Sequence, residues 1–166
     1  MSLSTRIRHW LTKLREHCAV AAEPWGWGRS KRPPAAKRSS LGYRGELAAA
    51  AFLERLGYRI VCHGYETPDG ELDLIAIDGD IVVYVEVKTL KRPGSRPEAA
   101  VHRNKRRQLI KLARAFAASR GLLHQRSRFD VVAVIWPDLD REPEIRHHLH
   151  AFRDDEHQRG VFRWEH

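Results

Sequence analysis

A chain of 166 residues has room for one domain of ordinary size with flanking extensions and is too short for two full domains. Its 42% apolar and 31% charged residues are typical of a soluble globular protein, and no apolar run approaches the roughly 20 residues of a membrane-spanning helix. Two cysteines without a CxxC spacing argue against a disulfide framework or a zinc ribbon and fit the cytoplasm best, while the formal net charge of +9 indicates a polyanionic partner.

Residues 1–39 are predicted to form a basic helix followed by a linker. The segment holds nine Lys and Arg against Glu16 and Glu23, so it carries +7 of the net charge. Apolar residues at spacings of three and four predict a short amphipathic helix, and EPWGWGRSKRPPAAKRSS has the composition of a linker. Nucleic acid is the first candidate partner of such a segment. An anionic membrane surface, an organelle-targeting segment and a solvated tail are the alternatives.

Residues 40–150 are predicted to form the domain, which begins with a helix and three strands. The helix starts at an N-cap, Ser39 or Ser40, runs through four alanines and stops at Gly57. A strand in YRIVCH, a turn-like GYETPDG and two alternating runs, ELDLIAI and IVVYVEVKT, follow it. The two runs flank DGD, which predicts a hairpin with a two-residue turn, either Asp78-Gly79 or Gly79-Asp80.

The second half of the domain is predicted to contain a helix and a buried strand. After the loop RPGSRPE, an apolar stripe from Val101 to Phe116 predicts a helix that ends at Gly121. The run RFDVVAVIW indicates a strand buried on both faces, and an edge strand is expected around residues 145–150, before a polar tail at 151–166. This order of elements predicts an α/β fold with a central mixed β-sheet flanked by helices.

Three charged residues interrupt the apolar strands of the hairpin and are predicted to lie together. Side chains alternate along a strand, so Glu86 and Lys88 point to the same side. Depending on the turn, Asp73 faces Tyr84 or Glu86 across the hairpin, and facing or diagonal side chains lie within roughly 5–8 Å. Asp73 and Glu86 are therefore candidates for converging on one cation. Glu71 shares the parity of Asp73 but is expected to be solvated beside the turn.

Two carboxylates this close repel each other unless a positive charge lies between them. Lys88 offsets one negative charge and a divalent ion would offset the other, with Mg²⁺ or Mn²⁺ suited to oxygen ligands. Such an ion polarises a phosphodiester and activates water, while Lys88 is placed to orient the water or to stabilise charge at phosphorus. The alternative is an ordinary ion pair of Asp73 and Lys88 at the end of the sheet.

The sequence GELAAAAFL, followed by GELDLIA and VYVEVKT, resembles the PD-(D/E)xK nuclease superfamily. The match is closer to the YraN family of small bacterial proteins, which are similar to archaeal Holliday junction resolvases, and it runs from about residue 41 to residue 136. The resemblance implies a restriction-endonuclease-like fold and a homodimer acting on two-fold junctions. It also implies a site with Asp73, Glu86, Lys88 and Glu46 as catalytic residues and with Asp73, Glu86 and Val87 at the metal.

Basic residues of the second predicted helix form the candidate nucleic-acid surface. They are Arg103, Lys105, Arg106, Arg107 and Lys111. This face is expected to follow the phosphate backbone of DNA rather than RNA, although a solvated helix face has the same composition. The resemblance also makes Gln108 a candidate for supporting the site, as a glutamine or lysine from this region does in some relatives. Glu66 and Leu90 stand where relatives usually carry basic residues, which weakens the expected phosphate contacts. The histidines in HHLH at 147–150 indicate a polar edge strand rather than a metal site.

Two functions follow from these features. The first is a metal-dependent nuclease that hydrolyses phosphodiester bonds in DNA, with branched or structured DNA as the expected substrate and Mg²⁺ or Mn²⁺ as the cofactor. The alternative is a non-catalytic nucleic-acid-binding module on the same fold. The acidic pair together with Lys88 favours the nuclease, because binding alone gains nothing from carboxylates near phosphates.

Overall fold

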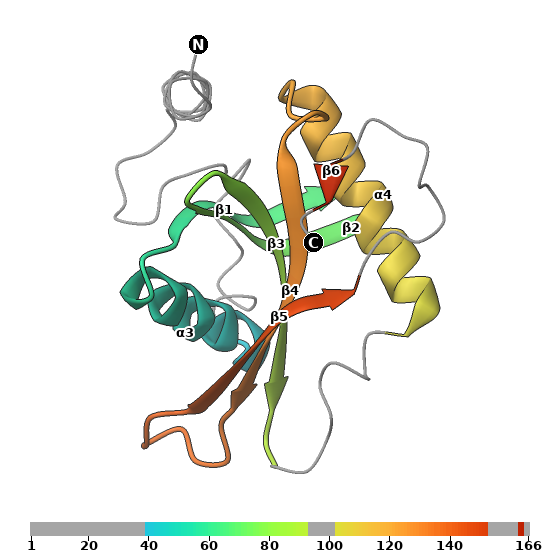
Figure 1. Ribbon diagram of the computed structural model, residues 1–166. Coiled ribbons are helices and arrows are strands. Elements are labelled where there is room, and N and C mark those ends of the chain that lie inside the picture. The colour runs from blue at the N-terminus through green and yellow to red at the C-terminus, as the bar shows by residue number, and fades with distance from the viewer. Residues whose placement is uncertain (1–38, 93–101, 153–162, 165–166) are drawn as a thin grey trace.

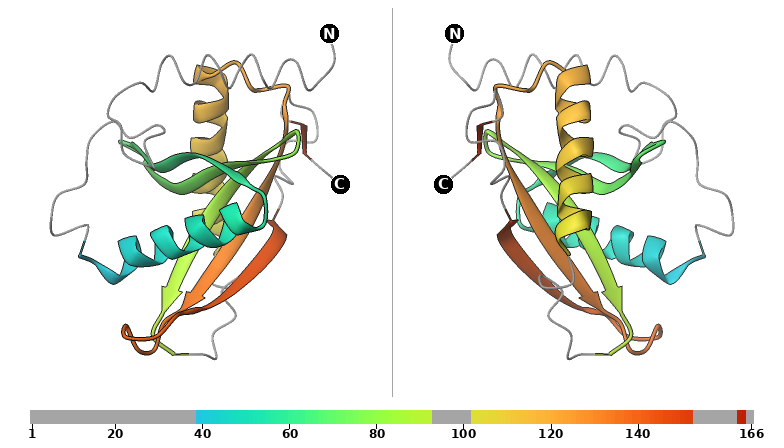
Figure 2. Two further views of the ribbon diagram at one scale, coloured as in Figure 1. Left: turned by 90° about the vertical axis from the view of Figure 1, so that its left-hand side faces the viewer. Right: turned by 90° about the vertical axis from the view of Figure 1, so that its right-hand side faces the viewer.

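A computed structural model describes residues 39–92, 102–152 and 163–164 (Figure 1). The predicted N-terminal helix and linker, the loop after residue 92, Val101 and most of the C-terminal tail lie outside the described residues. Within the described part, six strands form one mixed sheet, and two helices cover its opposite faces (Figure 2). The predicted α/β fold is confirmed, and it is consistent with a restriction-endonuclease-like fold.

Helix α3, Leu41–Arg55, covers one face of the sheet. The hydroxyl of Ser40 caps it by accepting a hydrogen bond from the backbone N–H of Tyr43 at 3.2 Å, and Gly57 follows its end with a φ of 91°. A Cβ atom at Gly45 would collide with the side chain of Thr89. Glycine at this position therefore lets the helix approach the strand that carries Glu86 and Lys88.

Strands β1, Arg59–Thr67, β2, Gly70–Asp78, and β3, Ile81–Leu90, form an antiparallel meander. Asp78 pairs with Ile81, so the hairpin turn is Gly79-Asp80, the second of the two predicted alternatives. The turn predicted over GYETPDG is too long. Pairing between β1 and β2 continues to Thr67 and Gly70, because Pro68 and Asp69 alone make the reversal.

Helix α4, Arg103–Ser119, crosses the other face and leads to β4, Arg126–Ile135, which pairs in parallel with β3. β5, Glu144–Phe152, pairs antiparallel with β4, and the short β6, Arg163–Trp164, pairs in parallel with it. The buried strand and the strand at 145–150 are thus confirmed. β5 continues past residue 150, where Phe152 is buried and stacks on Phe129 with ring centroids 4.6 Å apart.

Alternating side chains of the strands build two apolar cores, one on each face of the sheet. Ile75, Tyr84 and Phe129 pack with Phe116 of α4, whereas Leu74, Val83 and Val85 pack with Leu53 of α3. Both layers keep the central strands buried and rigid. Neither of the described helices is long and apolar enough to cross a membrane.

Candidate active site

The candidate site lies at a fork between β2 and β3. The last paired residues of this ladder are Leu74 and Val85, and continuing the register would set Glu86 opposite Asp73. The strands instead separate there, and Asp73 Oδ2 accepts a hydrogen bond from the backbone N–H of Val87 at 2.7 Å. The carboxylate of Asp73 thus takes the place of a strand partner, which fixes it beside Glu86.

Glu86 is buried, with 3% of its side chain exposed, and lies between two lysines. Its Oε1 accepts a hydrogen bond from Lys88 Nζ at 2.6 Å, and its Oε2 lies 3.4 Å from Nζ of Lys105, which comes from α4. Within the described part of the chain, Oε2 makes no hydrogen bond. Both lysine side chains are about one third exposed and so reach the solvent from the site.

The carboxyl group of Asp73 has a strongly perturbed acidity. Burial, and next the charge of Glu86, raise the pKa of Asp73 to about 7, although the N–H of Val87 and the ammonium groups of Lys105 and Lys88 act in the opposite direction. Near neutral pH the protonated and ionised forms of Asp73 are therefore both populated. A cation that entered the site would stabilise the ionised form of Asp73, because it would offset the repulsion from Glu86.

The residues present fit a hard divalent ion. The donors are carboxylate oxygens, and one of them, Glu86 Oε2, is buried without a hydrogen bond in the described region. Across residues 39–92 and 102–152, no group of three or more His, Cys, Asp and Glu side chains could hold a metal. An ion held by Asp73 and Glu86 would therefore take further ligands from water, the backbone or a substrate phosphate, as Mg²⁺ commonly does.

Two further acidic residues were considered from the sequence, Glu46 as an additional catalytic residue and Glu71 as a solvated one, and their roles stay predictions. Glu46 on α3 places its Oε2 3.8 Å from Nε2 of His63 on β1, and both side chains are largely buried. Glu71 pairs in register with Glu66 across β1 and β2, at the edge of the fork. Sequence reasoning did not single out His63, and a polar residue in an otherwise apolar strand is the signal that could have found it.

The predicted basic surface of α4 is present, but its members differ in their contacts. Arg103 and Arg107 are exposed, and Lys111 pairs with Asp69 at 2.8 Å. Arg106 stacks its guanidinium 5.6 Å from the ring centroid of Phe152, and Lys105 turns toward Glu86 instead. Gln108 donates to the backbone carbonyl of Asp69 at 2.6 Å, so its described contact is with the β1–β2 turn.

The first turn of α4 is electrostatically unfavourable for the helix itself. Four of its first five residues are Lys or Arg, and the N-cap residue His102 makes no side-chain hydrogen bond to the backbone. Cations at a helix N-terminus oppose the helix dipole and usually destabilise it. These charges are therefore better explained by a partner or by the neighbouring carboxylates than by the stability of α4.

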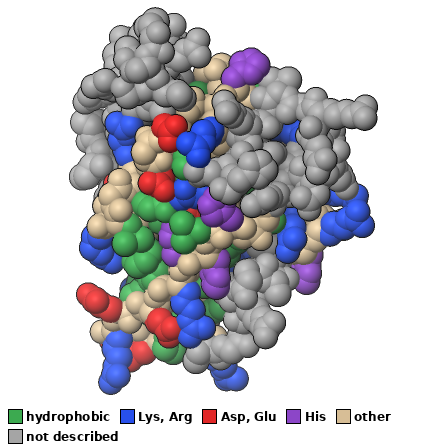
Figure 3. All heavy atoms as spheres, viewed as in Figure 1, with side chains coloured by type: hydrophobic (Ala, Val, Ile, Leu, Met, Phe, Trp, Pro, Cys, Tyr) green, Lys and Arg blue, Asp and Glu red, His purple; other side chains and the backbone are tan. Residues whose placement is uncertain are grey.

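The face seen in Figure 3 carries a mixture of charges. Histidine, acidic and basic side chains lie there among apolar ones, without forming a continuous basic surface over the described atoms. Basic side chains also lie at the right-hand edge, on the side where Figure 1 places α4. The α4 side is thus the better candidate for contact with a polyanion.

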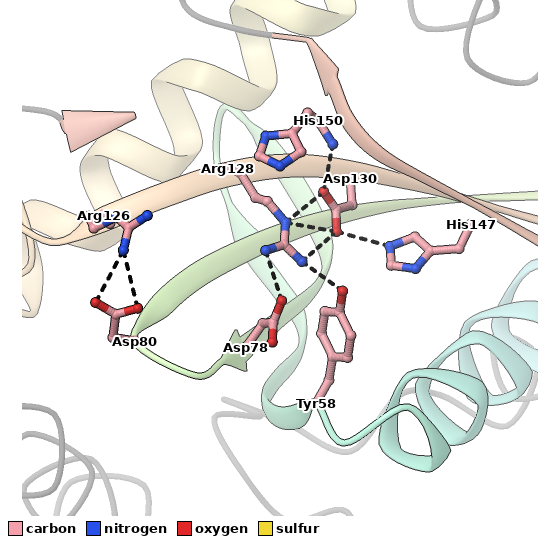
Figure 4. A network of polar contacts seen from close by, with 8 residues as sticks. All are labelled: Tyr58, Asp78, Asp80, Arg126, Arg128, Asp130, His147 and His150. Carbon is pink, nitrogen blue, oxygen red and sulfur yellow. Dashed lines mark hydrogen bonds and ion pairs between the residues drawn. The ribbon is translucent and has the colours of Figure 1, made fainter. Parts of the chain in front are cut away.

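A second polar cluster, missed by sequence reasoning, lies within β4 (Figure 4). Arg128 and Asp130 are both buried, and Arg128 Nε donates to Asp130 Oδ1 at 3.1 Å. Arg128 also donates to Asp78 at 2.9 Å and to the hydroxyl of Tyr58 at 2.7 Å. The signal was available as two opposite charges spaced two residues apart in an apolar run, the same spacing as Glu86 and Lys88.

Asp130 extends this cluster to the edge strand β5. Its Oδ2 lies 2.9 Å from Nε2 of His147, and its Oδ1 accepts from the backbone N–H of His150 at 3.0 Å (Figure 4). Burial alone would raise the pKa of Asp130, but the hydrogen bonds from His147 and Arg128 outweigh it and hold the pKa below its usual value. The cluster is thus a buried ionic link between β2, β4 and β5.

Comparison with known proteins places the chain in a family. The model of the family described as "Uncharacterised protein family UPF0102" matches residues 45–134, from α3 to the end of β4. The chain belongs to the UPF0102 family. The YraN resemblance inferred from GELDLIA and VEVKT is thereby confirmed, since both names denote one family. Glu46, Asp73, Glu86, Lys88 and Lys105 all lie inside the part that matches the UPF0102 model.

Individual UPF0102 relatives cover most of this region. A UPF0102 protein of Geobacter sulfurreducens is 44% identical over 115 residues, which cover 68% of this chain and 88% of the relative. A second, from Anaeromyxobacter dehalogenans, is 40% identical over 120 residues, or 71% of this chain and 87% of the relative. A third, from Rhodopirellula baltica, is 36% identical over 148 residues, or 86% and 85% of the two chains. The similarity therefore extends over nearly the whole length of the relatives.

Proposed function

We propose that this UPF0102 protein is a metal-dependent nuclease that hydrolyses phosphodiester bonds in DNA. The observation that supports it most is the meeting of two carboxylates at the β2–β3 fork, with Asp73 hydrogen-bonded to Val87 N–H and Glu86 held by lysines. A carboxylate pair of which Glu86 is buried and Asp73 half-buried is costly unless it holds a cation or a proton, so its presence beside an exposed basic helix indicates a function.

In this proposal Mg²⁺ or Mn²⁺ is bound by Asp73, Glu86 and Val87. The ion would supply Lewis-acid activation of the phosphodiester and of a bound water. Lys88 lies 2.6 Å from Glu86 and is partly exposed, so its ammonium can orient the attacking water or stabilise charge that builds up at phosphorus. Glu46 is the proposed additional acidic residue.

DNA is the proposed substrate, in branched or structured form, because the basic residues of α4 and of the N-terminal segment match a phosphate backbone. Exposed Arg103 and Arg107 lie on the same helix as Lys105, which touches the carboxylate site. Phosphates that follow α4 would thus pass close to Glu86. We also propose that the protein is a homodimer located in the cytoplasm. The dimer is proposed because a DNA junction with two-fold symmetry is matched by a protein with the same symmetry.

The competing candidate is a nucleic-acid-binding module without cleavage. One observation favours it: Lys88 and Lys105 already place two positive charges on Glu86 in the protein alone. An ion network that is neutral without a metal has the form of a structural salt bridge. Cleavage assays separate the two candidates.

The test is an incubation of the protein with junction, flap, linear duplex and single-stranded DNA, with Mg²⁺, with Mn²⁺ and with EDTA. We expect metal-dependent cleavage that Lys88→Ala lowers about 100-fold or more, with less than about tenfold change in DNA affinity. Arg141→Ala is the control, since Arg141 lies outside the basic surface of α4 and pairs with the exposed Asp138. Binding without cleavage of any substrate would leave the binding module as the function.

A further inference from the structure

The two lysines on Glu86 are held in different ways. Lys88 comes from the same strand and makes a short hydrogen bond to Oε1 at 2.6 Å. Lys105 comes from another element, lies 3.4 Å from Oε2, and leaves that oxygen without a hydrogen bond in the described part of the chain. Lys105 thus compensates the buried charge of Glu86 through space, and little geometry would be disturbed if another cation replaced it.

The place of Lys105 on α4 does not serve the helix. It lies among Arg103, Arg106 and Arg107 at the N-terminus, where each added positive charge opposes the helix dipole. The contact that offsets this cost is the one with Glu86. Its side chain is 32% exposed, and its flexible stem can carry the ammonium group from the carboxylate to the solvent side of α4.

We propose that Lys105 is an internal cation of the carboxylate site, which a divalent ion displaces from Glu86 and which then contacts a DNA phosphate. The proposal rests on the nuclease function above and extends it to the order of events. In the protein alone, the charges of Asp73, Glu86, Lys88 and Lys105 cancel when Asp73 is ionised. A divalent ion at the carboxylates repels both ammonium groups, and Lys105 is the one that makes no hydrogen bond to Glu86 and is therefore the more easily displaced.

Metal and lysine then compete for one carboxylate, while the released lysine adds a positive charge to the surface that faces DNA. Metal binding and DNA binding are therefore coupled through Lys105, and each strengthens the other by the same factor. Lys88 keeps its hydrogen bond to Oε1 and stays where it can orient the attacking water or stabilise charge at phosphorus. The two lysines thus have separate tasks.

The test is calorimetric titration of DNA-free protein with Mn²⁺. Lys105→Ala should bind Mn²⁺ about tenfold more tightly than the wild type, because no ammonium group has to be displaced. Lys105→Gln keeps much of the length of the side chain without the charge and should give the same change. Lys111→Ala is the matched control on the same helix and should leave the affinity unchanged.

A second measurement uses thermal unfolding in EDTA. Lys105→Ala should lower the melting temperature more than Lys111→Ala, because Glu86 loses one of its two cations. Adding Glu86→Gln should remove this difference, and excess Mn²⁺ should restore the single variant. Equal or weaker Mn²⁺ binding by Lys105→Ala and Lys105→Gln overturns the proposal, as does the absence of Mn²⁺ binding in all proteins. Tighter binding by both variants without any DNA cleavage supports it and refutes only the nuclease.

Discussion

The carboxyl group of Asp73 lies where a strand partner would lie in an uninterrupted hairpin. Its hydrogen bond from Val87 N–H fixes it at the β2–β3 fork, and burial with Glu86 nearby raises its pKa to about 7. In the unfolded chain the same group titrates near an ordinary value of about 3.9. Between these two values the native state keeps a proton that the unfolded state has released, so stability decreases as the pH rises through this window.

This linkage predicts the behaviour of Asp73→Asn in metal-free buffer. Asparagine is neutral at every pH and can still accept from Val87 N–H. The free energy of unfolding of the variant minus that of the wild type should therefore increase from pH 4 to pH 8, by on the order of 1–3 kcal/mol. Urea unfolding in EDTA at pH 4, 6 and 8 measures this. Asp69→Asn, at an exposed carboxyl group, is the control, and a difference independent of pH would contradict the prediction.

At the scale of elements, β4 is joined to its neighbours by the buried pair Arg128 and Asp130. Both side chains are almost fully buried, and the charge of each is stabilised by the opposite charge of the other. Asp130→Asn should therefore lower the free energy of unfolding by about 3–5 kcal/mol, because it leaves the Arg128 guanidinium without its main partner. Asp80→Asn removes the half-exposed pair with Arg126 and should cost less than about 1 kcal/mol.

Chemical denaturation at pH 7 compares the two variants. Equal losses of stability would show that the buried pair stabilises the fold no more than the pair of Asp80 and Arg126. The pH dependence provides a second check. The lowered pKa of Asp130 means that its contribution is present above about pH 4 and disappears as the pH falls through the native value. Asp130→Asn should therefore reduce the acid sensitivity of the protein.

The elements differ in how far sequence alone could define them. Alternation along β2 and β3 was sufficient to predict that Asp73, Glu86 and Lys88 share one side of the hairpin, because side chains along a strand alternate with a fixed period of two residues. The choice of turn stayed open until the Asp78–Ile81 pair decided it. The contact of Lys105 with Glu86 could not be predicted, since it depends on where α4 lies along the sheet, which no local pattern encodes.

The buried charges of β4 were missed for a related reason. Arg128 and Asp130 stand in a run that is apolar enough to indicate a core strand, and such charges are seldom buried unless they are paired. Their pairing requires Tyr58, Asp78 and His147 from three other segments. Burial of a charge is thus a tertiary property, whereas the strand itself is a local one.

For the whole molecule, the largest feature is the uneven charge. Residues 1–39 carry +7 of the net +9. Deleting them should weaken DNA binding and make the dependence of log K on log salt shallower, by about one unit for each phosphate that the shortened protein no longer neutralises. Fluorescence anisotropy at several salt concentrations measures the slope. The same deletion should leave Mn²⁺ affinity unchanged, and an unaltered salt slope would exclude the segment from DNA binding.

The position of β4 has a consequence for synthesis of the chain. β4 lies between β3 on one side and β5 and β6 on the other, yet it follows β3 only after residues 91–125. The meander β1–β3 contains only local pairings and can form as soon as it leaves the ribosome, whereas the parallel β3–β4 pairing must wait. During that interval the apolar residues 81–85 of β3 form an open strand edge. Chains that end before β4 therefore carry an aggregation-prone edge, and nascent chains need protection there.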